Sequence, residues 1–215
     1  MALIRVVNPN SNQAVTAGLD ACVEPFRSAA GIEIVCDTLD EGPFGIETDD
    51  HVAEVAAPLL AHMQANPADV QVIACYSDPG LALCRSKLNV PVFGIMESAI
   101  MYALARGGQF GVIALSEASI TRHVRAIREM GVESRLAAER PIGMSVADSG
   151  GDHALDQLLA AGKLLCDIDG ADTIILGCAG MAPQRTRLEQ ELGRPVIDPV
   201  QAAVGLALGT LLAAR

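Results

Sequence analysis

A segment that occurs twice, about 100 residues apart, constrains the fold of this chain more than any other feature. Residues 68–75 read Ala-Asp-Val-Gln-Val-Ile-Ala-Cys, and residues 171–178 read Ala-Asp-Thr-Ile-Ile-Leu-Gly-Cys. Shorter matches recur at offsets of about 100 to 104 residues in the same order, such as residues 88–92 with residues 192–196. Matches in a constant order are what a duplicated unit leaves in a sequence. We therefore predict two pseudo-symmetric halves, each with one copy of the cysteine segment.

Strands and helices are expected to alternate along both halves, which predicts an α/β fold. Apolar, β-branched runs indicate buried strands, and apolar residues at helical spacing indicate the helices between them. Such alternation gives parallel sheets with right-handed crossovers. We predict two lobes, each a parallel-stranded sheet flanked by helices, with the active site in the cleft between them. The first lobe is expected to comprise residues 1–97 plus 199–215, and the second residues 98–198.

The pattern also predicts where the individual elements lie. Pro58 falls inside one predicted helix and is expected to kink or break it. The final helix is expected to return and pack on the first lobe. Strands are predicted at residues 3–7, 31–36, 68–74, 90–95, 110–115 and 171–177, and helices at residues 13–30, 51–65, 81–88, 97–105, 119–130, 155–166 and 199–212.

The charge of the chain argues against a nucleic-acid partner. The formal net charge is -11, and the sequence has no cluster of Lys and Arg of the kind that phosphate binding needs. A small-molecule partner is the better expectation. No apolar run is long enough to span a bilayer, and the first apolar stretch is too short for the core of a secretion signal. We expect a cytoplasmic protein with no membrane partner, whose acidic surface and apolar helices are compatible with a homo-oligomer.

The six cysteines divide into two groups. None forms a CxxC pair, the spacing typical of zinc sites and thioredoxin-like motifs, so we expect free thiols and no metal site. Cys75 and Cys178 occupy matching positions in the repeat. The other four have no counterpart and are assigned to packing: Cys22, Cys36, Cys84 and Cys166.

Two matching thiols predict a specific chemistry. Ligands of parallel sheets bind beyond the carboxyl ends of the strands, where both thiols lie, so Cys75 and Cys178 are expected to flank one ligand. A thiolate on one face can remove a proton from a carbon acid while a thiol on the other face returns one, which is racemisation without a cofactor. Asp78 and Pro79 are a good cap and first turn for a helix after Cys75. Its N-terminus is expected to lower the thiol pKa and to stabilise an enolate oxygen.

Other chemically active residues are interpreted as structural. A lone Cys at a strand end is usually a packing residue, and only the repeat favours catalysis here. The acidic residues at 49–50 and within 129–139 are expected to form solvated faces. Gly107 and Gly108 lack the third glycine of a dinucleotide-binding motif. Four histidines without ligand spacing are expected on helix surfaces or in solvent: His51, His62, His123 and His153.

Four motifs spread over almost the whole chain carry a family resemblance. They are Val-Asn-Pro-Asn-Ser at residues 7–11, Cys-Tyr-Ser-Asp-Pro-Gly at 75–80, Pro-Val-Phe-Gly-Ile at 91–95 and Leu-Gly-Cys-Ala-Gly-Met-Ala at 176–182. They resemble the aspartate/glutamate/hydantoin racemase superfamily, and its hydantoin and allantoin racemase branch most closely. The resemblance implies a cofactor-independent isomerase on two α/β lobes with Cys75 and Cys178 as the acid/base pair. It also implies a substrate pocket lined by Asn10, Tyr76, Ser77 and Ala179.

Two comparisons within this superfamily refine the resemblance. Arylmalonate decarboxylases are similar but carry only the second cysteine, so the presence of Cys75 favours proton transfer over decarboxylation. Hydantoin racemases usually have Thr-Thr-Leu where this chain has Ala-Leu-Ser at residues 114–116. This change removes two hydroxyls from a substrate-facing loop, and Ser116 or Ser119 is expected to replace them.

Three functions remain open at this point. The first is racemisation of a 5-substituted hydantoin or a related cyclic ureide such as allantoin. The second is racemisation of aspartate or glutamate, which calls for cationic side chains near the cleft, and none of the motif loops carries Arg or Lys. The third is a non-catalytic protein that binds a small molecule in the same cleft.

Overall fold

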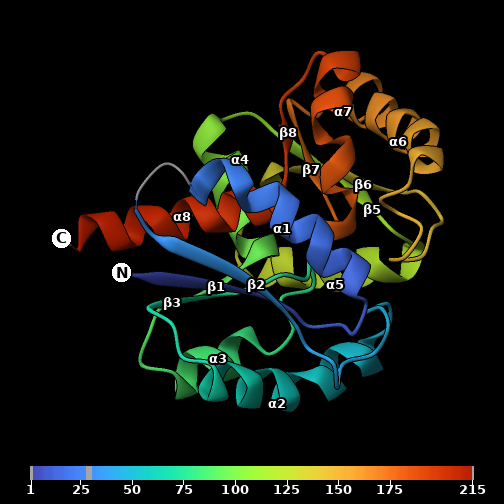
Figure 1. Ribbon diagram of the computed structural model, residues 1–215. Helices are drawn as coiled ribbons and strands as arrows, with labels where there is room; N and C mark the ends of the chain where they lie inside the picture. Colours follow the sequence, from blue (N-terminus) through green and yellow to red (C-terminus); the bar gives the residue numbers. More distant parts are fainter. Residues whose placement is uncertain (1, 28–30, 215) are drawn as a thin grey trace.

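The computed structural model describes residues 2–27 and 31–214, and it has two parallel sheets with helices on both faces (Figure 1). The first sheet has the order β2-β1-β3-β4 and the second the order β6-β5-β7-β8, so the two follow one topology. All recorded strand pairs are parallel. The predicted α/β fold of two repeated lobes is therefore confirmed.

The six predicted strands lie close to their expected positions, and the structure adds two that were not predicted, β6 and β8. The two strands that precede the matching cysteines are buried at every residue, as their apolar runs indicate. The bounds in the first sheet are β1 Leu3–Asn8, β2 Glu33–Thr38, β3 Val70–Ile73 and β4 Val92–Gly94. Those in the second are β5 Phe110–Ala114, β6 Leu136–Pro141, β7 Thr173–Leu176 and β8 Val196–Ile197.

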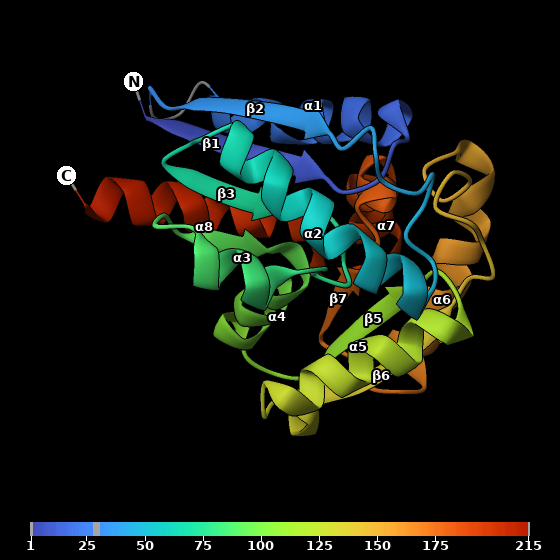
Figure 2. The ribbon, with the colours of Figure 1, turned by 90° about the horizontal axis from the view of Figure 1, so that it is seen from below.

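The helices cover the sheets on both sides. Figure 2 shows α2 and α3 on one face of the first sheet and α1 and α8 on the other. The α-helices are α1 Gln13–Arg27, α2 Asp49–Ala65, α3 Leu81–Lys87, α4 Ile95–Arg106, α5 Glu117–Glu129, α6 Leu155–Asp167, α7 Arg185–Leu192 and α8 Pro199–Ala213. Three short 3₁₀ helices are η1 Glu133–Arg135, η2 Asp152–Ala154 and η3 Ala179–Gln184.

The last helix packs on the first sheet although it follows the second sheet in sequence. Val200, Ala203 and Val204 of α8 share one buried cluster with Ile4 of β1 and Val72 of β3. Asp198 begins α8 by accepting hydrogen bonds from the backbone N–H groups of two of its first residues. The return of α8 agrees with the expectation for this helix. The exact lobe boundaries stay a prediction.

One predicted helix break is absent, and the predicted end of another helix is not tested. The helix α2 runs through Pro58 without a break, with Thr48 as its N-cap. The helix α1 is described to Arg27, and residues 28–30, where its predicted end falls, lie outside the described residues. Among the described residues, no helix is both long enough and apolar enough to cross a bilayer.

Candidate active site

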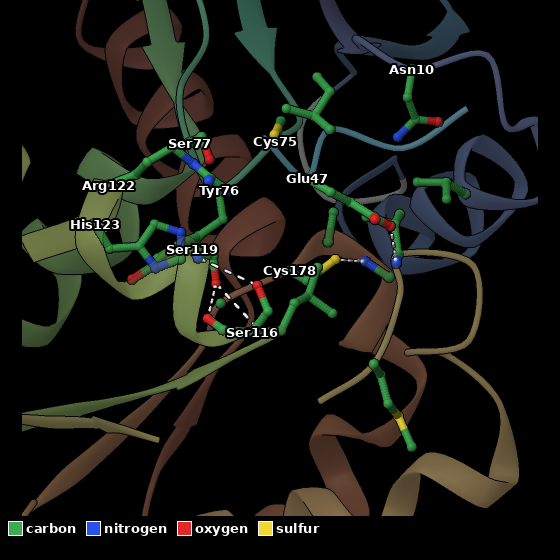
Figure 3. A pocket seen from close by; sticks show the side chains of 18 of the residues that line it. Asn10, Glu47, Cys75, Tyr76, Ser77, Ser116, Ser119, Arg122, His123 and Cys178 are labelled. Carbon is green, nitrogen blue, oxygen red and sulfur yellow. Dashed lines mark hydrogen bonds between the residues drawn. The ribbon is translucent and has the colours of Figure 1, made fainter. Parts of the chain in front are cut away.

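The seven site residues predicted from the sequence line one cavity between the two lobes. The space in this cavity that the centre of a water-sized sphere can reach is about 80 Å³. It lies beyond the carboxyl ends of β3 and β7, the position at which parallel sheets bind ligands. Figure 3 shows the two thiols within it. The predicted residues that line it are Asn10, Cys75, Tyr76, Ser77, Ser116, Cys178 and Ala179.

Cys75 lies in a turn rather than at the start of a helix. Its carbonyl oxygen accepts a hydrogen bond from the N–H of Asp78 at 2.9 Å, and α3 begins only at Leu81. The Asp78 carboxylate instead accepts hydrogen bonds from the N–H groups of Met96 (3.0 Å) and Glu97 (2.9 Å) in the first turn of α4. The prediction that Asp78 caps the next helix was therefore wrong, because the start of α4 offers two free N–H groups in its place.

Cys178 does lie at a helix N-terminus. It is the N-cap of η3, and its Sγ accepts a hydrogen bond from the N–H of Gly180 at 3.4 Å. The hydroxyl of Ser149 lies 3.8 Å from the same sulfur. A Cβ at position 180 would lie 2.6 Å from that hydroxyl oxygen, so glycine lets Ser149 approach Cys178.

Burial raises the pKa values of both thiols, so the expected lowering was wrong. Burial raises the pKa of Cys75 to about 12, although the N–H of Ser77 and the charge of Arg122 favour its thiolate. Burial also raises the pKa of Cys178, against the N–H of Gly180 and the hydroxyl of Ser149. Loss of water around each sulfur outweighs a few N–H groups, so both residues are thiols at neutral pH.

The polar residues predicted to line the pocket are largely engaged by their neighbours. The side-chain oxygen of Asn10 accepts hydrogen bonds from the Asn8 side chain and the Asn12 N–H, both at 3.0 Å. Ser116 caps α5 in a reciprocal arrangement with Ser119, so both hydroxyls already serve this cap. Both serines line the cavity, and their replacement of the threonine hydroxyls stays a prediction.

The structure adds a buried histidine that the sequence pattern placed wrongly. The side chains of His123 and Glu139 are 2% and 0% exposed, and His123 Nδ1 lies 2.9 Å from a Glu139 carboxylate oxygen. Burial raises the pKa of Glu139, and His123 opposes this rise. The ring of Tyr76 meets that of His123 edge to face at a centroid distance of 4.8 Å. His123 was expected at the surface and Glu139 on a solvated face. The local pattern of apolar and polar residues does not show that these two side chains contact and bury each other.

Two charged residues outside the motifs also line the cavity. Arg122 comes from α5, and Glu47 from the loop before α2. In Figure 3, Arg122 and His123 lie to one side of the thiols and Glu47 to the other. A carboxylate oxygen of Glu47 accepts a hydrogen bond from the N–H of Val146 at 3.0 Å. None of the motif loops carries Arg or Lys, but the helix α5 supplies a cation, Arg122, to the cavity.

The remaining cysteines lie outside this cavity. Cys84 is fully buried in the core, and the Cys22 thiol donates a hydrogen bond to the Asp198 carboxylate at 3.1 Å. All six cysteines are free. Within residues 2–27 and 31–214, no group of three or more His, Cys, Asp or Glu side chains is placed to hold a metal ion.

Comparison with known proteins places the chain among racemases. The model of the Asp/Glu/Hydantoin racemase family matches residues 4–207. The hydantoin racemase of Paenarthrobacter aurescens is 34% identical over 211 residues, covering 95% of this chain and 89% of the relative. The structure of allantoin racemase from Klebsiella pneumoniae superposes with a TM-score of 0.92 at 29% identity, covering 100% of this chain and 89% of that one. Allantoin racemase from Pseudomonas fluorescens gives 0.90 at 28%, covering 99% and 91%.

Proposed function

Since the chain belongs to the Asp/Glu/Hydantoin racemase family, we propose that it racemises a 5-substituted hydantoin or a related cyclic ureide such as allantoin. The observation that carries this proposal is the pair of thiols on one cavity. Cys75 and Cys178 come from equivalent positions in the two halves, and both line the same space. The relatives named hydantoin racemase and allantoin racemase support the choice of substrate class.

The proposed reaction needs only these two side chains as acid and base. The thiolate of one cysteine takes the proton from the α carbon, and the electron pair of the C–H bond moves onto the neighbouring carbonyl as an enolate. The thiol of the other cysteine then gives its proton to the opposite face. The product is the other enantiomer, and the thiolate has moved from one residue to the other. Exchange of protons with water restores the starting state.

Burial of the thiols suits one half of this reaction and limits the other. A thiol with a raised pKa keeps the proton that it must deliver, so each cysteine is prepared as an acid. The base form is scarce, and its formation depends on pH. The N–H groups of Ser77 and Gly180 are the local groups that favour it. The rate is therefore expected to rise with pH.

A second candidate is the racemisation of an acidic amino acid, which Arg122 alone favours. A substrate with two carboxylates would have to place one of them away from Arg122, in a cavity that also presents the carboxylate of Glu47. Repulsion there makes the cyclic ureide the better fit, because its N–H groups can donate to a carboxylate. Asn10, Tyr76, Ser77, Ser116 and Ala179 are proposed to line the substrate.

A solvent-exchange panel tests the proposal. Single enantiomers of 5-benzylhydantoin, allantoin, aspartate and glutamate are incubated with the protein in D₂O, and the loss of the Cα–H signal and of optical rotation is followed. We expect racemisation with deuterium incorporation for a ureide, unchanged after treatment with EDTA. Turnover of aspartate or glutamate alone would establish the second candidate. Binding without exchange for every compound would mean that the protein is a non-catalytic binder.

A further inference from the structure

Arg122 occupies an unusual place for a cation. It lies on α5 and lines both the thiol cavity and a neighbouring cavity of the surface. Its side chain is only 9% exposed. Figure 3 shows it on the same side of the thiols as Ser77 and His123. A buried charge at the wall of a ligand cavity is costly unless a partner compensates for it.

The compensation that the described residues give to Arg122 is weak. Its Nη1 donates to the carbonyl oxygen of Ala118 in its own helix at 3.2 Å. Its Nε is buried and has no hydrogen-bond partner within the described part of the chain. The carboxylate that pairs with Arg122 is that of Asp49, which lies 3.6 Å from the Nε and is 62% exposed. Arg125 also pairs with Asp49, at 3.2 Å. A guanidinium with these contacts can still donate strong, charge-assisted hydrogen bonds to an anion.

The opposite side of the cavity has the opposite charge. One carboxylate oxygen of Glu47 accepts a hydrogen bond from the N–H of Val146. The carboxylate also lies close enough to Cys178 to raise the pKa of that thiol. A carboxylate there accepts N–H groups and repels a second anion. The cavity thus offers an acceptor for ureide N–H groups at one end. At the other end it offers a cation whose buried Nε has no hydrogen-bond partner in the described part of the chain.

From this arrangement we propose that the preferred substrate is a cyclic ureide whose 5-substituent carries a carboxylate, and that Arg122 selects it. The inference rests on the proposed function and narrows its substrate class. The ring would place its N–H groups toward Glu47, and the anionic substituent would reach Arg122. An uncharged substituent leaves the guanidinium with only its contacts to Asp49 and the Ala118 carbonyl, and a second carboxylate meets Glu47. A substrate with a single negative charge, placed at the Arg122 end of the cavity, fits both Arg122 and Glu47.

The test compares two substrates of nearly equal shape. Hydantoin-5-acetate carries the carboxylate, and its primary amide replaces that group by a neutral one. We expect kcat/KM of the wild-type protein to be about tenfold or more higher for the acid, the worth of one charge-assisted pair. Arg122→Gln should bring the ratio close to one by lowering kcat/KM for the acid while the amide is largely spared. Arg122→Lys, which keeps a charge, should retain part of the preference.

Arg125→Gln is the matched control. It removes the same charge from the same helix and the same contact to Asp49, but Arg125 does not line the thiol cavity. It should keep the wild-type ratio. Equal kcat/KM values of the wild type for the acid and the amide would overturn the inference, and this result does not depend on any variant folding correctly. An equal loss of kcat/KM for both substrates in Arg122→Gln would overturn it as well.

Failure of the proposed function is visible separately. If the wild type racemises neither compound nor 5-benzylhydantoin, the activity itself is wrong. Calorimetric binding of the acid and the amide then still tests Arg122: a wild-type preference for the acid that Arg122→Gln removes supports selection of the anion, and equal affinities contradict it.

Discussion

The two halves of the molecule place their thiols identically with respect to the sheets but surround them differently. Cys75 follows β3 and Cys178 follows β7, each two residues after the last residue of its strand. Around Cys75 the chain makes a turn whose Asp78 is used by another helix. Around Cys178 the chain begins η3, and Ser149 adds a hydroxyl contact. Repetition has thus preserved the backbone positions and not the surroundings.

The charges show why the halves differ. Arg122 belongs to the second half and favours the thiolate of Cys75 in the first half. Glu47 belongs to the first half and disfavours the thiolate of Cys178 in the second. Each half therefore sends a charged side chain toward the thiol of the other. A site built in this way is complete only when both lobes are in place, and its two thiols are not equivalent.

The largest expected effect comes from removing either thiol. Cys75→Ser and Cys178→Ser should each reduce racemisation by about 10³-fold or more, because a serine hydroxyl is far too weak an acid to act as the base at neutral pH. The control is Cys166→Ser, whose position in α6 lies outside the cavity. Racemisation is followed by polarimetry. Full activity in either variant would mean that the missing thiol only packs.

The pH dependence is the next largest effect. Because burial raises the pKa of both thiols, the thiolate is scarce at neutral pH, and its amount grows tenfold for each unit. The logarithm of kcat/KM should therefore rise with a slope of about one between pH 7 and 9. A plateau that begins below pH 8 would contradict the raised pKa values.

Gly94→Ala tests the turn that is peculiar to the first half. A Cβ at this position would lie 2.2 Å from the Asp78 carboxyl carbon, so Asp78 must leave the start of α4 and the turn of Cys75 must shift. We expect a loss of about 2 kcal/mol in the free energy of unfolding and about a tenfold loss of rate. Gly209→Ala in α8 is the control, because within the described residues nothing lies within 4 Å of its Cβ. An unchanged rate in Gly94→Ala would show that this turn does not position Cys75.

The smallest expected effect makes the second half resemble the first. Ser149→Ala removes the hydroxyl that lowers the pKa of Cys178. The rate at pH 8 should therefore fall a few-fold, which corresponds to the free energy of about one net hydrogen bond or less. The loss should stay the same from pH 7 to 9, where the thiolate is scarce in both proteins, and should shrink only as the pH approaches the raised pKa of the thiol. Ser86→Ala on the exposed face of α3 is the control. An unchanged kcat/KM at pH 8, together with a lower free energy of unfolding, would assign Ser149 to packing alone.

The sequence predicted what depends on local pattern and repetition. Apolar runs located the buried strands, and the constant offset identified Cys75 and Cys178 as a pair. Asp78 was misplaced because its partners, Met96 and Glu97, are distant in the chain. Arg122 and Glu47 were missed because they come from a helix and a loop outside the motifs. Only the packing of the two lobes brings them to the thiols.

The thiol pKa values were misjudged for a related reason. A cysteine near backbone N–H groups looks activated in sequence, but the cost of burial depends on the whole cavity wall. His123 shows the same limit. Its pairing with Glu139 joins α5 to β6, and no local spacing reveals that contact.

The central claim is that the two thiols serve opposite faces of one carbon. A variant with one remaining cysteine can still remove a proton and return it on its own face. Deuterium wash-in from D₂O is therefore measured by NMR for each pure enantiomer of the best substrate, with Cys75→Ser and with Cys178→Ser. We expect exchange without racemisation in each variant, with the two variants acting on opposite enantiomers. Exchange of the same enantiomer by both variants would contradict the account.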